Sequence, residues 1–260
     1  MLRVTRLLPL VLAAALVACA GLTEDLTKDW TPERFYQEAR EKMADGNWLE
    51  AISLFEQLEA RYPYGRHTEQ AQLELTYVHY KDGERELALA AADRFIRLHP
   101  THPHVDYAYY LKGIINFRGE KGLVHTMFRM DDQVWDRDPK SARESYNAFR
   151  ELVERFPTSR YAKDAVDRMR YLQDAQARYE VSIARFYLER GAYVAAVNRS
   201  KYALENYPRS PVVEDALGIQ AEAYKQMGLT QLAEDTLRVL RMNFPESRYL
   251  KEVGETESAG

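Results

Sequence analysis

One spacing occurs four times along this chain of 260 residues, and it restricts the fold more than any other feature. A glycine is followed five residues later by an alanine and twelve residues after that by a proline. Helical periodicity flanks each glycine, which predicts a turn between antiparallel helices because glycine tolerates a positive φ. The alanine lets the two helices approach closely, and the proline ends the second helix. The four sets are Gly46, Ala51 and Pro63; Gly83, Ala88 and Pro100; Gly191, Ala196 and Pro208; and Gly228, Ala233 and Pro245.

Pro157 is a fifth proline of this pattern, and the intervals from Pro100 to Pro157 and from Pro157 to Pro208 are longer than the others. We expect an inserted loop, 118–139, to interrupt the third unit after Gly113. The stretch from Arg160 to Arg190 contains no glycine or proline, so we expect one continuous helix about 46 Å long. A serine stands two residues after Pro157, Pro208 and Pro245, and each serine is expected to cap the next helix. These serines are Ser159, Ser210 and Ser247.

The predicted architecture is an all-α superhelical solenoid of about five helix-turn-helix repeats. Repeats 1 to 3 occupy 31–159, the joining helix and repeats 4 and 5 occupy 160–250, and 251–260 is a flexible tail. The third repeat matches least well, because Lys140 and Ser145 stand where the turn glycine and the alanine belong.

Apolar residues on the second helix of each pair occur at helical spacing. This periodicity predicts a packed core and not a catalytic pocket. The expected core residues are Trp48, Phe55, Leu58, Ala88, Phe95, Phe149, Leu152, Tyr193, Ala203, Leu237 and Leu240.

Composition and motifs argue against several classes of function. The formal net charge is -4, so no overall basic field attracts phosphates and no nucleic-acid partner is expected. One cysteine rules out an internal disulfide framework. The chain lacks a GxSxG elbow, a phosphate-binding glycine loop and an HExxH motif. We therefore expect no enzyme, no metal and no cofactor.

Two clusters of polar residues leave other interpretations open. His99, His102 and His104 could meet a divalent metal, but the two prolines among them favour a turn between helices. The acidic residues of the inserted loop lack the glycine and final glutamate of a calcium loop, so we expect them to be solvated. They are Asp131, Asp132, Asp136 and Asp138.

The N-terminus has the pattern of a secretion signal. Residues 1–18 have a basic start and an apolar run that is shorter than the ~20 residues of a membrane-spanning helix. The run ends in Leu16-Val17-Ala18-Cys19, which matches the bacterial lipobox, although an ordinary signal peptide would also fit. We expect Cys19 to carry S-diacylglycerol and an N-acyl chain, which together anchor the protein stably. Residues 19–30 are then a lipidated tether, and Thr31 and Pro32 begin the first helix.

The repeat resembles the tetratricopeptide repeat, in which the first helix of each pair lines a concave surface. In the N-terminal repeats these positions carry aromatic residues, which suit the binding of a substrate chain. Alternatively, the tyrosines pack against neighbouring repeats. The substrate-binding candidates are Tyr36, Tyr77, Tyr80, Tyr107, Tyr110 and Phe117. The C-terminal repeats carry charged residues instead, and the partner-binding candidates there are Arg178, Arg185 and Arg199.

The whole pattern resembles the BamD, or ComL-type, lipoprotein family of the machinery that inserts β-barrel proteins into the outer membrane. The most specific strings are VDYAYYLKG at 105–113, DRDP at 136–139 and YLERGAYVAAVNR at 187–199. The resemblance implies a non-enzymatic scaffold of the BAM complex, on the periplasmic face of the outer membrane. It also implies that the C-terminal repeats bind the POTRA domains of BamA, alongside other BAM lipoproteins. The N-terminal repeats are implied to recognise the aromatic-ended C-terminal segment of unfolded barrel clients.

Two alternatives remain at this point. Another outer-membrane tetratricopeptide lipoprotein, organising the Tol-Pal or peptidoglycan machinery, would carry the same anchor and groove. A metal-dependent enzyme that uses the histidine cluster is the more remote alternative.

Overall fold

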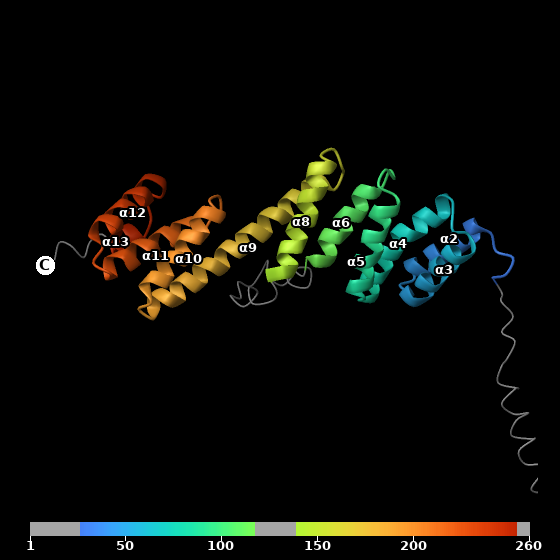
Figure 1. Ribbon diagram of the computed structural model, residues 1–260, viewed down its shortest axis with the longest axis horizontal. Coiled ribbons are helices and arrows are strands. Elements are labelled where there is room, and N and C mark those ends of the chain that lie inside the picture. The colour runs from blue at the N-terminus through green and yellow to red at the C-terminus, as the bar shows by residue number, and fades with distance from the viewer. Residues whose placement is uncertain (1–26, 118–138, 254–260) are drawn as a thin grey trace, which may run out of the picture. The chain divides into compact units, whose positions relative to one another are not determined.

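The computed structural model describes residues 27–117 and 139–253, and these ranges contain helices and turns without strands (Figure 1). The signal peptide, Cys19, most of the inserted loop with its aspartates, and residues 254–260 lie outside the described residues. The chain divides into two compact units, 1–71 and 72–260, and the division falls within α4 (Arg66–Asp82). The predicted all-α helical-repeat class is confirmed.

Unit 1 is built on α2 (Pro32–Ala44) and α3 (Trp48–Arg61). The predicted start of α2 is confirmed: Thr31 is its N-cap, Pro32 follows as the first helical residue, and the Thr31 Oγ1 accepts a hydrogen bond from the Arg34 amide at 3.3 Å. Both helices bury their apolar faces against each other. The fully buried side chains are Phe35, Ala39, Ala51, Phe55 and Leu58.

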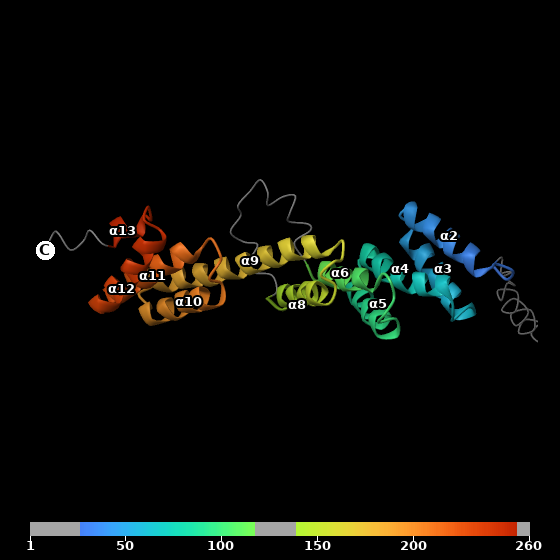
Figure 2. The ribbon, with the colours of Figure 1, turned by 90° about the horizontal axis from the view of Figure 1, so that it is seen from above.

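Unit 2 continues α4 and contains the remaining helices. Its described helices are α5 (Arg85–Leu98), α6 (Val105–Asn116), α8 (Pro139–Arg155), α9 (Ala162–Glu189), α10 (Tyr193–Asn206), α11 (Val213–Gln226), α12 (Thr230–Asn243) and α13 (Tyr249–Glu252). Successive helices of this unit pack in antiparallel pairs, with α6 against α8 and α10 against both α9 and α11 (Figure 2).

The repeat signature has the predicted geometry. The four turn glycines have φ values of 74°, 91°, 73° and 72° in chain order, and the four repeat alanines are all buried. The residue before each proline leaves the helical region, as Tyr62 does with φ -129° and ψ 71°, because proline disfavours helical backbone in its predecessor. In the third repeat, Ser145 replaces the alanine. It is completely buried, and its Oγ donates a hydrogen bond to the Gly113 carbonyl at 2.9 Å.

The long joining helix is confirmed as α9, which has 28 residues. Its N-terminal half lies beside α8 and its C-terminal half beside α10 (Figures 1 and 2). Ala165 and Leu172 belong to one core, shared with Phe95 and Phe149 of the preceding repeats. Val181 and its neighbours belong to a second core with α10 and α11. The expected boundary between 159 and 160 therefore does not separate two cores, because apolar residues of α9 complete the third repeat.

Most of the predicted core residues are buried. Of the eleven, Trp48, Tyr193 and Leu237 are only half-buried, and the others are buried. The periodicity therefore identified the inward face of the second helices correctly, apart from Trp48 and Tyr193 at the start of their helices and Leu237 within α12.

The predicted serine caps are wrong. α9, α11 and α13 begin at Ala162, Val213 and Tyr249 without a side-chain cap. A turn intervenes between serine and helix, in which the Ser159 carbonyl accepts from the Ala162 amide at 3.0 Å. The Ser159 Oγ accepts from the Tyr161 amide within this turn at 3.1 Å and donates to Asp106 Oδ2 at 2.7 Å, so this serine ties the turn to α6.

Candidate protein-binding surfaces

Five tyrosines of unit 2 lie close together and form what we call the tyrosine surface. Three of them pack against a small apolar cluster of α5 and α6, formed by Ala88, Leu111 and Ile115. The other two join them through ring contacts. The tyrosine surface consists of Tyr77 and Tyr80 of α4, Tyr107 and Tyr110 of α6, and Tyr161 before α9.

Tyr161 stacks on the rings of α6. Its centroid lies 4.7 Å from that of Tyr110, with an interplanar angle of 19°, and 5.3 Å from that of Tyr107. The Tyr110 hydroxyl donates to Asp164 Oδ2 at 2.7 Å, and the same oxygen accepts from Arg168 Nε at 2.6 Å. Part of the expected aromatic face is therefore occupied by intramolecular packing, as the alternative interpretation of the tyrosines proposed.

Burial raises the pKa of three tyrosines of this surface, Tyr107, Tyr110 and Tyr161, above the usual value of a phenol. Burial raises the pKa of Tyr110 to about 12, and its hydrogen bond to Asp164 adds to the shift. Burial, followed by the negative charge of Glu74, raises the pKa of Tyr107. Although burial opposes it, hydrogen bonds from Arg168 and Tyr110 lower the pKa of Asp164. The surface thus offers neutral hydroxyls beside one ionised carboxylate.

Two of the six substrate-binding candidates lie elsewhere. Phe117 is 3% exposed and packs on Phe149 and Tyr171, so its expected position on an accessible face is wrong. Tyr36 belongs to unit 1, where its ring packs on Phe55 and His67.

Sequence reasoning missed Tyr161, although the sequence contained a signal. The string Pro-x-Ser-Arg-Tyr occurs at 157–161 and again at 245–249. In both copies the arginine lies over the ring of its neighbouring tyrosine, at 5.4 Å for Arg160 and 4.8 Å for Arg248. Each tyrosine docks on the first helix of the helix pair that precedes it: Tyr161 on α6 and Tyr249 on α11.

The three arginine candidates differ in their surroundings. Arg178 is exposed and makes no ion pair within the described residues. Arg199 Nη1 lies 2.9 Å from Glu180 Oε2, and the Glu180 side chain is only 12% exposed. Arg185 is half-buried and pairs with Asp215. Two of the three thus already have intramolecular carboxylate partners.

Arg185 takes part in what we call the Asp215 cluster, formed by Arg185, Asp215, Arg248 and Tyr249. Asp215 Oδ1 accepts hydrogen bonds from Arg185 Nη2 at 3.1 Å, Arg248 Nη2 at 3.0 Å and the Tyr249 hydroxyl at 2.6 Å. Both Nη2 atoms also donate to the Tyr249 oxygen, at 3.1 and 2.9 Å. Burial first, and the hydrogen bond to Asp215 second, raises the pKa of Tyr249.

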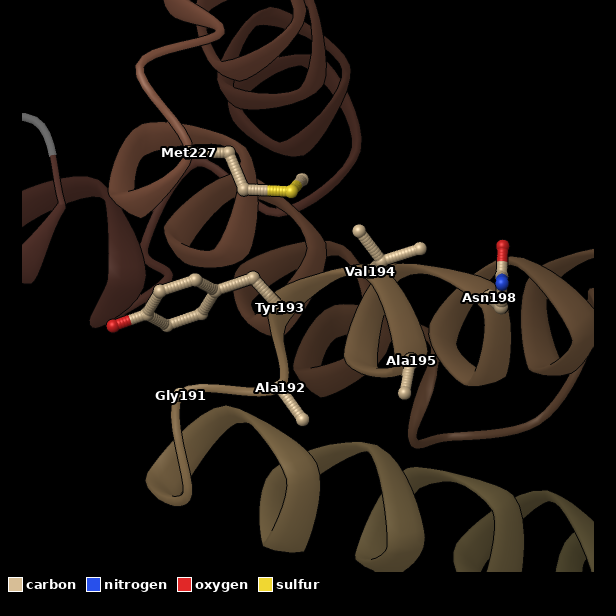
Figure 3. Close-up of a pocket in the computed structure, with 7 residues that line it drawn as sticks. All are labelled: Gly191, Ala192, Tyr193, Val194, Ala195, Asn198 and Met227. Atoms are coloured by element: carbon tan, nitrogen blue, oxygen red, sulfur yellow. The ribbon is translucent and has the colours of Figure 1, made fainter.

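A shallow hollow of about 490 Å³ lies beside the turn between α9 and α10 (Figure 3). Tyr193, Val194 and Met227 give it an apolar lining, with Asn198 of α10 at one side. Val194 is 64% exposed, so an apolar side chain faces solvent at its rim. This arrangement suits the docking of a protein surface better than the enclosure of a small molecule.

A family model described as "Outer membrane lipoprotein" (YfiO) matches residues 28–240. The chain belongs to this family. An outer membrane protein assembly factor BamD from Neisseria meningitidis is 46% identical, with 95% of this chain and 93% of the relative covered. The BamD of Vibrio cholerae is 37% identical, with 90% and 96% covered. Among solved structures, the MamA protein is 15% identical at a TM-score of 0.39, with 86% of this chain and 95% of that chain covered.

The YfiO family match includes most of the candidate residues but not all of them. The tyrosine surface, the three arginine candidates and the hollow lie inside the matched range. Arg248 and Tyr249 of the Asp215 cluster lie beyond its end at residue 240. The family model therefore does not cover this part of the site.

The histidine cluster has a structural explanation in this YfiO-family chain. His99 and His102 pack their rings on Phe95, at 5.1 and 5.2 Å between centroids. His99 Nε2 lies 2.7 Å from Gln72 Oε1. Within 27–117 and 139–253, no three or more His, Cys, Asp or Glu residues gather in a way that could hold a metal ion. In the same ranges no helix has the length and apolar character needed to cross a membrane.

Proposed function

We propose that this protein is a non-enzymatic scaffold lipoprotein of the BAM complex, which assembles β-barrel proteins into the outer membrane. The observation that carries the proposal is the 46% identity to a protein named as an outer membrane assembly factor, over nearly the whole of both chains. The separate tyrosine surface and apolar hollow support a protein with two binding faces.

The hollow and the arginines of α9 and α10 are the proposed contact for BamA POTRA domains. Apart from Met227, the residues that line the hollow lie in the run 187–199, which is one of the strings most specific to the BamD family. An exposed apolar patch with polar residues at its edge is the usual composition of a protein interface.

The tyrosine surface is the proposed contact for unfolded barrel clients. An extended segment that ends in an aromatic residue can bury its ring against tyrosines, while neutral hydroxyls bond its backbone. Within this surface Tyr110 is the weaker candidate for bonding a client's backbone, because its hydroxyl already donates to Asp164.

Two single substitutions test whether the faces act independently. Val194→Glu places a charge on the exposed rim of the hollow and should weaken binding of a POTRA fragment without affecting a client peptide. Tyr77→Ala should do the opposite. Leu49→Glu, at a position 70% exposed in unit 1, is the matched control and should affect neither. Isothermal titration at low and moderate salt measures all three variants. Unchanged POTRA binding by Val194→Glu, or loss of both partners by a folded Tyr77→Ala, contradicts the proposal.

The lipid anchor is a second part of the proposed function. Cys19 would carry the acyl chains and hold the protein at the periplasmic face of the outer membrane, alongside the other BAM lipoproteins. Cys19→Ser should release the protein into the soluble fraction with its helical circular dichroism unchanged. Tight association of this variant with protein-free lipid vesicles would contradict the anchor.

A further inference from the structure

The Asp215 cluster carries more positive than negative charge. Two guanidinium groups share a single carboxylate, and both bond the same oxygen atom, Oδ1. The Arg185 and Arg248 side chains are 40% and 60% exposed, so neither charge is sealed from an approaching group. Arg178 lies two helical turns before Arg185 on α9 and adds a further unpaired positive charge to that face.

Most of the donors of the two guanidiniums are unused. A guanidinium has five N–H donors, and within the described part of the chain both arginines use only Nη2 for hydrogen bonds. Their Nε and Nη1 groups therefore keep N–H donors, and one such donor from each arginine can bond an oxygen of a second carboxylate.

Contacts within the chain hold the side chains of the Asp215 cluster in place without a binding partner. Tyr249 is 6% exposed and lies directly on Gly218, where an added Cβ would stand 2.2 Å from the ring. The Tyr249 hydroxyl bonds both arginines and Asp215, so it holds the two guanidiniums side by side. Holding the donors in place in advance lowers the entropic cost of binding.

We propose that Arg185 and Arg248 together bind a carboxylate of an aspartate or glutamate on the surface of a POTRA domain. This inference rests on the proposed function and adds a specific charge contact to it.

Acetate tests whether the carboxylate site exists, independently of any partner. In the lipidated full-length protein in detergent micelles, the ¹⁵Nε resonances of Arg185 and Arg248 should shift saturably as acetate is added. Chloride at equal ionic strength should have no such effect. The control is Arg238, an exposed arginine on α12 whose partner is Asp235 one turn earlier. Non-saturating shifts equal to those of Arg238 would overturn the site.

The POTRA fragment tests whether the partner uses the site. Arg248→Gln should weaken its Kd about tenfold, which corresponds to about 1.4 kcal/mol, and should reduce the salt dependence of binding. Arg185→Gln should act in the same direction, and Arg238→Gln should leave binding unchanged. Wild-type affinity in a folded Arg248→Gln variant overturns the inference. A wild-type protein that fails to bind the fragment contradicts the proposed function instead, and saturable acetate binding would still support the carboxylate site.

Discussion

Gly113 allows the closest contact between two helices in the third repeat, and substituting it gives the sharpest test of the packing. Gly113 lies on α6 and faces Phe149 of α8, which is fully buried. A Cβ built at Gly113 would stand 2.3, 2.5 and 2.7 Å from three ring carbons of Phe149. Carbon atoms in contact normally lie about 3.5–4.0 Å apart, so the ring or the helix must move by more than 1 Å.

The expected free-energy change follows from two opposing effects. Alanine in a helix interior is favoured over glycine by about 1 kcal/mol. Overpacking a well-packed core costs about 1–3 kcal/mol and occasionally more, and Phe149 has little room because Tyr110 and Phe117 lie against it. We expect Gly113→Ala to reduce the free energy of unfolding by about 1–2 kcal/mol. For a protein of this size that lowers Tm by about 2–8 °C.

The assay is thermal and chemical denaturation of Gly113→Ala, Phe149→Leu and the double variant. A smaller side chain at 149 makes room for the new methyl group, so the double variant should be more stable than the sum of the single effects predicts. A higher Tm for Gly113→Ala alone would mean that helix propensity outweighs the contact, and would refute the reasoning.

Two further predictions concern α9 and the tyrosine surface. Ala175→Pro removes a hydrogen bond in the middle of α9 and should cost about 3 kcal/mol or more, whereas Ala175→Gly keeps the amide and should cost about 1 kcal/mol. Small-angle scattering of the proline variant should change if α9 holds its two cores rigidly, and an unchanged profile would argue against that role. Tyr110 has its pKa raised from 10.0 to about 12, so its contribution to stability is complete below pH 10 and is lost as the pH rises through 12. Urea denaturation between pH 8 and 12 should therefore show a larger loss in the wild type than in Tyr110→Phe, and equal losses would contradict the assignment.

The sequence by itself determined the repeat and the connections within it. Glycine at 46, 83, 191 and 228 is required by positive φ, and proline ends each second helix, so both effects act through local backbone geometry. The continuity of α9 followed from the absence of helix breakers for the same reason. Most of the core followed from periodicity, because a helix that buries one face must repeat its apolar residues on that face.

The tertiary structure decided which side chains of the candidate site remain accessible. The helical spacing predicts that Tyr110 and Phe117 lie on an accessible face. In the structure Phe117 is buried, and the ring of Tyr161, which lies more than forty residues away in the sequence, stacks on Tyr110. The sequence shows that Arg185 and Arg199 are charged, but it does not show that carboxylates of other helices pair with them. Serine is a common helix-capping residue, but an extra turn separates the serines that follow the prolines from the next helices. Periodicity assigns a residue to a face of its own helix, whereas accessibility depends on what the neighbouring elements lay over that face, and only packing in three dimensions determines that.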